Sequence, residues 1–353
     1  MRFIHAADIH LGAQPDKGKP WSELRREEIW HTFRKLLEFT EEEKVDLLLL
    51  AGDLFHRPPL LRELKEVNYL FGKLSHTQVV WIAGNHDYLR PDAPARNFEW
   101  ADNVCFLGGK TCEYVCFEEL QATVYGFSYY QKEITQPLYD QLYPCAEGGC
   151  HILLAHGGDA SHIPIDKRKL AESGFDYVAL GHIHKPQTLV KDQIVYAGAL
   201  EPIDVNETGL HGCVLGEYQN GVVQTEFVPM ACREYVHLEM ICTRDDTDYA
   251  VRDRLEAEIH RRGREHLYKV TLTGYRSPDT RFSVQSYTQC GNIVEISDET
   301  CPDYDFEELL RVHRGDLIGK YIEKLLPCPE DGEEQRRVRE RALYYGLDVL
   351  CKH

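Results

Sequence analysis

The feature that most constrains the fold is a set of apolar runs of strand length that lead directly into a glycine. Asp46 to Ala51 and Gln78 to Ala83 are two such runs, and the second is rich in β-branched residues. Buried central strands have this composition because both of their faces pack against other layers. The segment before the first run, Trp21 to Val45, has apolar residues at near-helical spacing and is an expected helix. We therefore expect a layered α/β domain.

The same reading extends over the first 230 residues. Further strands are expected at Arg2 to Ala7, Ala122 to Phe127, His151 to Ala155, Tyr177 to Leu180 and Ile194 to Ala197. A hairpin at Gln219 to Gly221 is expected to close this part of the chain.

After Met230 the pattern changes. Tyr235 to Cys242 and Tyr268 to Thr273 are expected strands, and between them Val251, Leu255 and Ile259 mark one face of a charged helix. From residue 315 onward two helical stretches are expected, separated by an acidic loop at 327–335 that contains two prolines. We predict a large domain at 1–230, a small α+β domain at 231–314 and a C-terminal helical segment at 315–353.

Length and charge narrow the classes of function. A chain of 353 residues exceeds the size that one core usually serves. Its formal net charge of −18 argues against a protein that coats DNA, because phosphate binding is driven largely by lysine and arginine. This objection weakens if bound divalent cations or a partner subunit supply the positive charge.

Cysteine usage and hydropathy bear on location. The twelve cysteines form neither a CxxC pair nor a regular framework, so we expect free thiols in a reducing cytoplasm. Asp8 and His10 stand where a signal peptide needs apolar residues. The longest aliphatic run, Leu47 to Ala51, is too short to cross a bilayer. We therefore expect a cytoplasmic protein without a membrane span.

Five motifs supply polar side chains at or just past the expected strand ends. They are Asp8-Ile9-His10, Gly52-Asp53-Leu54-Phe55-His56, Gly84-Asn85-His86-Asp87, Ala155-His156-Gly157 and Gly181-His182-Ile183-His184. All five can converge, because active sites of layered α/β folds gather at the carboxyl ends of strands. A lone histidine is more often a hydrogen-bonded structural residue, but that interpretation fails for seven candidate ligands in five ordered motifs.

These side chains match the needs of a two-metal site. Two cations about 3.5 to 4 Å apart require a shared carboxylate, for which Asp53 is the natural choice. One site would be completed by Asp8, His10 and His184, and the other by Asn85, His156 and His182. The mixed nitrogen and oxygen donors suit manganese, iron or zinc, with magnesium as a further alternative.

The ordered pattern DxH, GDxF, GNHD, His-Gly and GHxH resembles the calcineurin-like metallophosphoesterases over residues 2 to about 184. His56, three residues after Asp53, and the opening segment Met1 to Gly12 are similar to the SbcD-type DNA repair exonucleases, which include the meiotic-recombination nucleases. Within that group, the likeness is greatest to the YhaO-type branch.

The resemblance implies a β-sandwich flanked by helices, with residues 231–314 as a cap over the substrate. It implies manganese-dependent cleavage of DNA phosphodiesters, as an exonuclease with endonuclease activity as a further option. The implied partners are DNA and an SbcC-like coiled-coil ATPase, with a homodimer as an option. The same metal core serves small-molecule phosphodiesterases and protein phosphatases, and the acidic charge favours that alternative. The full ligand set disfavours a scaffold that only binds.

Three further residues are candidates for catalysis. His86 is the best placed to protonate the leaving oxygen. Asp87 would orient that ring or cap the local turn, and we favour the capping role. His56 would contact the substrate phosphate, position His86, or simply pack as a loop histidine.

Two segments outside the motifs leave alternatives open. His260, Arg261, Arg262 and Arg264 could touch a DNA backbone, but a solvated helix end is the preferred interpretation. An apolar stripe on the C-terminal helices would either dock a partner or pack on the chain itself. Its members are Leu317, Ile318, Tyr321, Ile322, Leu325 and Leu326.

Overall fold

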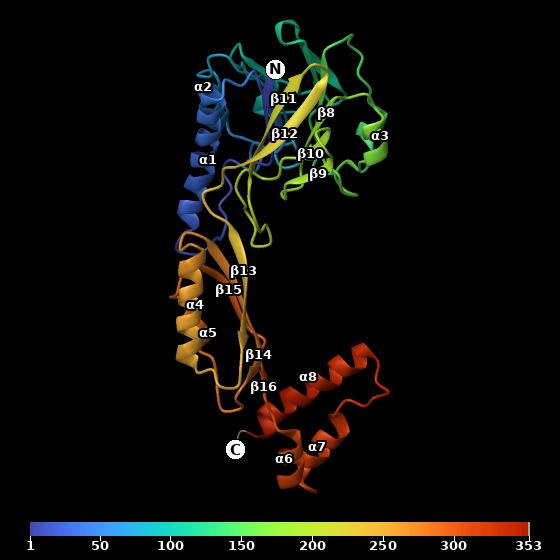
Figure 1. Ribbon diagram of the computed structural model, residues 1–353. Helices are drawn as coiled ribbons and strands as arrows, with labels where there is room; N and C mark the ends of the chain where they lie inside the picture. The colour runs from blue at the N-terminus through green and yellow to red at the C-terminus, as the bar shows by residue number, and fades with distance from the viewer. Residues whose placement is uncertain (352–353) are drawn as a thin grey trace. The chain divides into compact units, whose positions relative to one another are not determined.

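The computed structural model describes residues 1–351 and divides the chain into two compact units, Met1–Tyr235 and Val236–His353. Figure 1 labels many of the helices and strands of both. Of the segment expected at 315–353, residues 352 and 353 lie outside the described part. In that described part, none of the helices has both the length and the apolar character that a bilayer crossing requires.

The first unit is a sandwich of two six-stranded sheets. The first sheet has the order β12-β11-β1-β2-β3-β4. Its strands are β1 (Arg2–Ala6), β2 (Leu47–Ala51), β3 (Gln78–Ile82), β4 (Val104–Phe106), β11 (Gly212–Gln219) and β12 (Val222–Pro229). The second sheet has the order β5-β6-β7-β8-β10-β9. Its strands are β5 (Glu113–Phe117), β6 (Ala122–Gly126), β7 (Cys150–His156), β8 (Tyr177–Gly181), β9 (Gln187–Val190) and β10 (Ile194–Tyr196).

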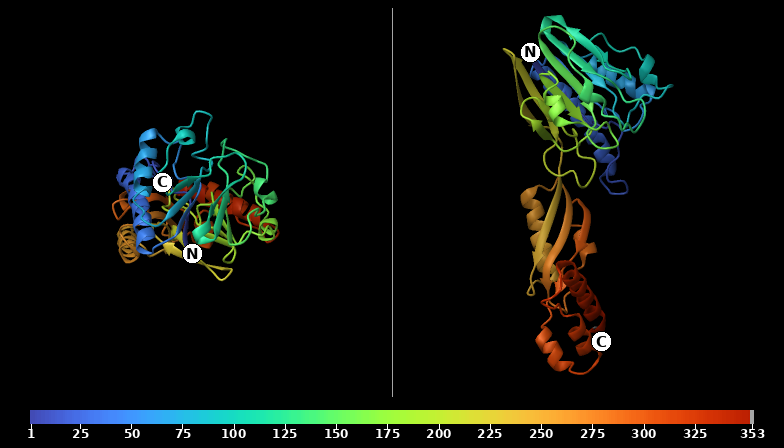
Figure 2. Two further views of the ribbon diagram at one scale, coloured as in Figure 1. Left: turned by 90° about the horizontal axis from the view of Figure 1, so that it is seen from above. Right: turned by 90° about the vertical axis from the view of Figure 1, so that its right-hand side faces the viewer.

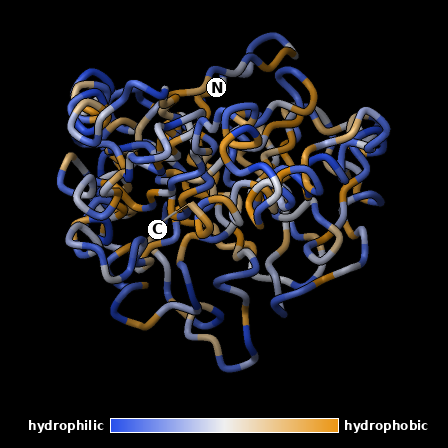
Figure 3. Tube along the Cα trace, turned by 90° about the horizontal axis from the view of Figure 1, so that it is seen from below, coloured by the Kyte–Doolittle hydropathy of each residue, from blue (hydrophilic) through white to orange (hydrophobic). Residues whose placement is uncertain are grey.

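Three apolar layers hold this sandwich together. Between the sheets, Leu49 and Ile82 of the first meet Ile152 and Leu154 of the second. The outer face of the first sheet is covered by α1 (Ser22–Glu42) and α2 (Leu61–Phe71), and α3 (Lys167–Ala171) belongs to the opposite side. Figure 1 and the view from above in Figure 2 both show strands between these helices. Figure 3 colours the Cα trace by hydropathy, and hydrophobic stretches alternate with hydrophilic loops along it. The expected layered α/β class is confirmed.

The register explains why the motifs meet. Strands β1, β2 and β3 pair in parallel, and so do β7 and β8. Parallel strands end at the same edge of a sheet, so the residues that follow them are brought together. All of these strands consist of buried residues over nearly their whole length, as their apolar sequences predicted.

Some boundaries differ from the sequence-based expectation. The first long helix ends at Glu42 and does not reach Val45, because Lys44 adopts a left-handed conformation with φ of 51°. Helix α2 was not expected, although Leu64, Val67 and Phe71 form its buried stripe at helical spacing. The last helix begins at Glu333, inside the segment that was expected to be a loop as far as Gln335.

The second unit contains a four-stranded sheet and helices. Strands β13 (Tyr235–Cys242), β14 (Leu267–Arg276) and β15 (Ile293–Asp298) lie in that order, and β16 (Cys301–Pro302) pairs with β14. Helix α4 (Asp248–Arg262) packs Val251, Leu255 and Ile259 into the apolar cluster of this sheet, and α5 (Val284–Tyr287) adds to it. The Thr247 hydroxyl accepts a hydrogen bond from the Ala250 N–H and caps α4.

The C-terminal helices form a separate apolar cluster within this unit. They are α6 (Phe306–Val312), α7 (Leu317–Leu325) and α8 (Glu333–Leu350). Ile322 of α7 is fully buried with Leu343 and Leu347 of α8. Most of the apolar stripe therefore packs on the chain itself, whereas Leu317 is 69% exposed. In α4, Arg261 and Arg262 both bind the Glu258 carboxylate, which agrees with a solvated helix end.

All twelve cysteines are free thiols, as the irregular spacing indicated.

Candidate metal centre

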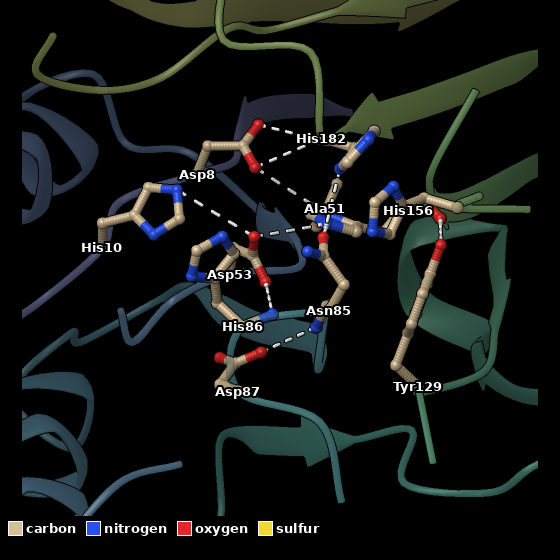
Figure 4. Close-up of polar contacts among 12 residues, drawn as sticks. Asp8, His10, Ala51, Asp53, Asn85, His86, Asp87, Tyr129, His156 and His182 are labelled. Atoms are coloured by element: carbon tan, nitrogen blue, oxygen red, sulfur yellow. Dashed lines mark hydrogen bonds and ion pairs between the residues drawn. The ribbon is translucent and has the colours of Figure 1, made fainter. Parts of the chain in front are cut away.

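The five sequence motifs meet at one edge of the first unit (Figure 4). The loop after β1 supplies Asp8 and His10, the loop after β2 supplies Asp53, and the loop after β3 supplies Asn85 and His86. The second sheet supplies His156 at the end of β7, and His182 and His184 after β8. In Figure 4 the side chains of Asp8, Asp53, Asn85, His156 and His182 point toward one another. The seven predicted ligands thus come together.

The backbone of this site is strained where the donors stand. Asp8, His10 and Asp53 have φ values of 50°, 52° and 51°, and His182 has a φ of 94°. Residues other than glycine rarely adopt such backbone angles, and each such residue lowers the stability of the fold by of order 1–3 kcal/mol. Hydrogen bonds hold the loops in place, since Asp8 N–H donates to Gly52 O and His10 N–H to Asp53 O, at 3.1 and 3.0 Å. The surrounding structure therefore sustains an unfavourable local geometry.

One group of donors comprises Asp8, His10 and His184. The ligand atoms of these three residues lie within 4.8 Å of one another. The Nε2 atoms of His10 and His184 are 3.0 Å apart. Two nitrogens bound to one ion at ~2.1 Å each are ~3 Å apart when the bonds are perpendicular, so this spacing suits a shared cation.

A second group surrounds the Asn85 side chain. Asn85 Oδ1 lies 2.8 Å from His156 Nε2 and 3.1 Å from His182 Nδ1. The main chain at His156 is fixed, because its carbonyl accepts hydrogen bonds from the Tyr129 and Tyr139 hydroxyls at 2.9 and 3.3 Å. Two imidazole nitrogens and one amide oxygen therefore converge.

Asp53 lies between the two groups. Its Oδ2 is 3.4 Å from His156 Nε2 and 3.9 Å from His10 Nε2, and its Oδ1 accepts a hydrogen bond from His86 N–H at 2.8 Å. Gly84 is required beside it, because a Cβ there would collide with Asp53 Oδ1. A carboxylate in this position can serve both groups.

The titration of these carboxylates and imidazoles follows their surroundings. Burial alone would raise the pKa of Asp53, but the imidazoles of His156, His10 and His86 hold this pKa well below its usual range. Burial raises the pKa of Asp8 to about 6. Although burial opposes protonation of His156, the Asp53 carboxylate raises the pKa of His156 to about 9. The site is thus a network of buried, interacting charges.

The donor set fits bound cations. Asp8 and Asp53 are 0% and 1% exposed, and within residues 1–351 neither pairs with a lysine or an arginine. Buried charges are normally paired or coordinate metals. Imidazole nitrogens together with carboxylate and amide oxygens suit divalent transition metals. These clusters of histidine and aspartate are therefore able to hold metal ions.

The three predicted catalytic residues lie close to these donors. The rings of His56 and His86 are stacked with centroids 5.2 Å apart, and His86 Nδ1 lies 3.2 Å from the His56 carbonyl oxygen. His56 Nδ1 is 3.4 Å from His10 Nδ1. Burial and the neighbouring His86 lower the pKa of His56. Both rings lie beside the ring of His10, which belongs to the donor group of Asp8, His10 and His184.

The Asp87 carboxylate turns toward the backbone. Its oxygens accept hydrogen bonds from Gly84 N–H at 2.7 Å and from Phe55 N–H at 3.1 Å. These contacts tie the loop after β3 to the loop after β2, as the capping alternative anticipates. Burial and the nearby Asp53 raise the pKa of Asp87 to about 7.

Two carboxylates at the site were missed by the sequence reasoning. Asp159 Oδ2 is 2.6 Å from His182 Nε2, and Glu207 Oε1 is 2.6 Å from His184 Nδ1. Both stand in irregular loops, and neither belongs to one of the five motifs. The one usable signal is the position of Asp159 three residues after His156, in a glycine-containing turn.

Comparisons with known proteins agree with this geometry. A family model described as calcineurin-like phosphoesterase matches residues 1–186. The chain is 33% identical over 248 residues to the uncharacterized metallophosphoesterase YhaO of Bacillus subtilis (strain 168), covering 64% of this chain and 60% of YhaO.

Archaeal relatives are also similar. The DNA double-strand break repair protein Mre11 of Methanopyrus kandleri is 28% identical over 263 residues, covering 65% of this chain and 56% of that protein. Mre11 of Methanocaldococcus jannaschii is 28% identical over 263 residues, covering 68% of this chain and 69% of that protein. The chain thus matches less than two thirds of YhaO and of the Methanopyrus protein. The family match covers more than half of the chain and contains the motifs from Asp8 to His184, so the chain belongs to the calcineurin-like phosphoesterase family.

Proposed function

We propose that this phosphoesterase is a DNA nuclease that uses two divalent cations to hydrolyse phosphodiester bonds. The observation that carries the proposal is the position of Asp53 between two separate donor groups, 3.4 Å from His156 and 3.9 Å from His10. Similarity to the archaeal repair proteins Mre11 supports DNA as the substrate class. Manganese is the preferred ion of the proposal, as the resemblance to the SbcD-type nucleases implies, and the mixed nitrogen and oxygen donors also suit iron and zinc.

The proposed ligands divide into two sets that share Asp53. Asp8, His10 and His184 would hold one ion, and Asn85, His156 and His182 the other. When bound, the pair of ions would activate the attacking water and neutralise charge that develops on the phosphoryl oxygens. The chain contributes buried loops with a strained backbone, which hold the donor side chains in place before substrate arrives.

His86 is the proposed proton donor to the leaving oxygen. Its Nδ1–H can donate to the His56 carbonyl oxygen at 3.2 Å, which fixes the ring. In the doubly protonated imidazolium, the Nε2–H would then be the proton that is delivered, leaving a neutral ring with its proton on Nδ1. His86 is only partly buried, unlike His10 and His156, so a substrate can reach it. Asp87 would act by holding the loop that carries Asn85 and His86, and His56 by contacting the substrate phosphate beside His86.

The proposal extends to a partner and a cellular role. We propose that the nuclease works in DNA repair and recombination as the catalytic subunit of a complex with an SbcC-like coiled-coil ATPase. A partner of this kind would supply part of the cationic surface that a chain with a net charge of −18 lacks. The acidic charge also favours a second candidate function, hydrolysis of small phosphodiesters or of phosphoproteins by the same metal centre.

One assay separates the two candidates. Purified protein with manganese is tested side by side on duplex DNA, on a cyclic nucleotide and on a phosphopeptide. The nuclease proposal predicts cleavage of DNA that disappears with a chelator and returns when manganese is added. Hydrolysis of the small substrates without any cutting of DNA would refute it and support the second candidate.

A further inference from the structure

His156, His182 and His184 each have a hydrogen-bonding partner at the ring nitrogen that faces away from the donor groups. The Nδ1 of His156 faces the Ala51 carbonyl oxygen at 2.9 Å. The distal nitrogen of His182 faces the Asp159 carboxylate and that of His184 the Glu207 carboxylate, each at 2.6 Å. Two imidazoles are thus held by an anion and one by a neutral carbonyl.

These partners fix which ring nitrogen carries the proton. A carboxylate or carbonyl oxygen only accepts hydrogen bonds, so the nitrogen facing it must be N–H. The lone pair of His182 then lies on Nδ1, the atom 3.1 Å from Asn85 Oδ1. The lone pair of His184 lies on Nε2, the atom 3.0 Å from His10 Nε2. In each case the free lone pair is directed into the donor group.

Both carboxylates are themselves anchored by the main chain. Asp159 Oδ1 accepts hydrogen bonds from Ser161 N–H at 2.7 Å and His162 N–H at 3.0 Å. Glu207 Oε2 accepts one from Ile203 N–H at 2.7 Å. One oxygen of each carboxylate therefore secures its own loop, and the other is presented to a histidine. The Glu207 side chain is 15% exposed and that of Asp159 is 45% exposed, so the backbone hydrogen bonds, more than burial, hold Asp159 in place.

We propose that Asp159 and Glu207 are positioning residues that act on different metal ions. Asp159 acts through His182 on the ion of the Asn85 and His156 set, and Glu207 acts through His184 on the ion of the Asp8 and His10 set. This inference rests on the proposed two-ion site. Carboxylates that hold a metal-bound histidine fix its orientation and raise its basicity, and their loss typically lowers metal affinity about 10- to 100-fold.

The surroundings of Asp159 define a competing arrangement. His162 Nδ1 lies 2.9 Å from the same Asp159 oxygen, and the ligand atoms of Asp159, His162 and His182 lie within 4.8 Å of one another. These three side chains could hold an ion of their own. Such an ion would need a free lone pair on His182 Nε2, and this nitrogen has none while it carries the proton of the N–H group that donates to Asp159. The 2.6 Å contact favours the hydrogen bond.

The test is a manganese titration of the metal-free full-length chain by calorimetry, with bound metal counted after dialysis. Asp159→Leu is expected to lower the affinity for one of the two ions about 10- to 100-fold and to leave the affinity for the other unchanged. Glu207→Leu is expected to weaken the other ion by a similar factor. Asp159→Asn and Glu207→Gln retain an oxygen acceptor and are expected to restore part of the affinity, which a purely structural role does not predict.

Asp204→Leu serves as the control, because it removes an exposed carboxylate from the loop that carries Glu207. The Oδ1 atom of Asp204 accepts hydrogen bonds from the backbone and side-chain N–H groups of Asn206. Thermal melting of the metal-free proteins identifies any variant that fails to fold. If a leucine variant fails to fold, the metal affinity of the corresponding amide variant is used in its place. The inference is overturned if either leucine variant lowers the affinity for both ions equally, or lowers neither. Three ions in the wild type and two in Asp159→Leu would make Asp159 a ligand and overturn it too. A wild type that binds fewer than two ions defeats the proposed function itself.

Discussion

The centre of the first unit's site consists of buried polar side chains, whereas the centre of the α6–α8 cluster in the second unit is apolar. Asp8, Asp53 and His156 are almost completely buried, and so are Ile322 and Leu347. Burying polar groups is unfavourable unless partners compensate, while burying apolar groups stabilises directly. The buried carboxylates and imidazoles of the first unit therefore lower stability, and their role in chemistry explains why they are present. The helical cluster needs no function to explain its packing.

The comparison predicts opposite consequences for substitutions in the two regions. Changes in the metal centre should alter metal binding and hydrolysis with little loss of folding. Changes in the α6–α8 cluster should lower stability with little effect on hydrolysis by the first unit.

The largest effect is expected for Asp53→Ala. This change should abolish hydrolysis and lower bound metal at both positions, because the Asp53 carboxylate faces both donor groups. Metal content by elemental analysis and hydrolysis of a nitrophenyl phosphodiester check it, with Asp204→Ala as a surface control. Loss of one ion with the other retained would show that Asp53 does not bridge.

The next largest effect is expected for His86→Gln. DNA cleavage should slow by about 10² to 10⁴, the usual contribution of a positioned proton donor, with metal content unchanged. A nitrophenolate leaving group needs little protonation, so the variant should lose far less activity on a nitrophenyl phosphodiester. The two rates are measured on the same preparation.

The contrast between substrates isolates the role of His86. Equal losses on both substrates would mean that His86 acts on the phosphoryl group or on the ions. Loss of bound metal would make His86 a ligand, in line with its place in a group with His10 and His56.

A smaller effect, confined to stability, is expected for Ile322→Ala. Ile322 is fully buried in the α6–α8 cluster, so its truncation should cost about 2 to 5 kcal/mol of the free energy of unfolding of that cluster. Calorimetric melting checks this value. Leu317→Ala, at a 69% exposed position of the same helix, is the matched control and should change stability little. Hydrolysis by either variant should stay at the wild-type rate, and a loss of hydrolysis would break the comparison.

The smallest effect on chemistry is expected from ending the chain before Gly315. Hydrolysis of a nitrophenyl phosphodiester should remain intact, because the donors lie between Asp8 and His184. Binding of a coiled-coil partner should be lost if residues from Gly315 onward carry partner affinity. Unfolding of the shortened chain would show instead that α7 and α8 serve only as part of the fold.

The sequence was most informative where local chemistry decides the structure. The strands at Gln78–Ile82 and Tyr177–Gly181 were predicted to within a residue, because each is a buried apolar run. The ligand motifs follow those strands directly, so their convergence could also be predicted. Asp159 and Glu207 could not, because their contacts with His182 and His184 depend on how irregular loops return to the site. The sandwich of two sheets was expected from the family resemblance alone, because the pairing of strands that are far apart in the sequence leaves no local pattern.

Counting bound manganese while hydrolysis is measured shows whether this edge of the sandwich is a two-metal phosphodiesterase centre. Metal-free protein is titrated with manganese while bound ions and hydrolysis of a nitrophenyl phosphodiester are measured together. We predict two ions per chain, with hydrolysis rising as the second ion binds. Full hydrolysis with one ion, or hydrolysis that persists in a chelator, would contradict the claim.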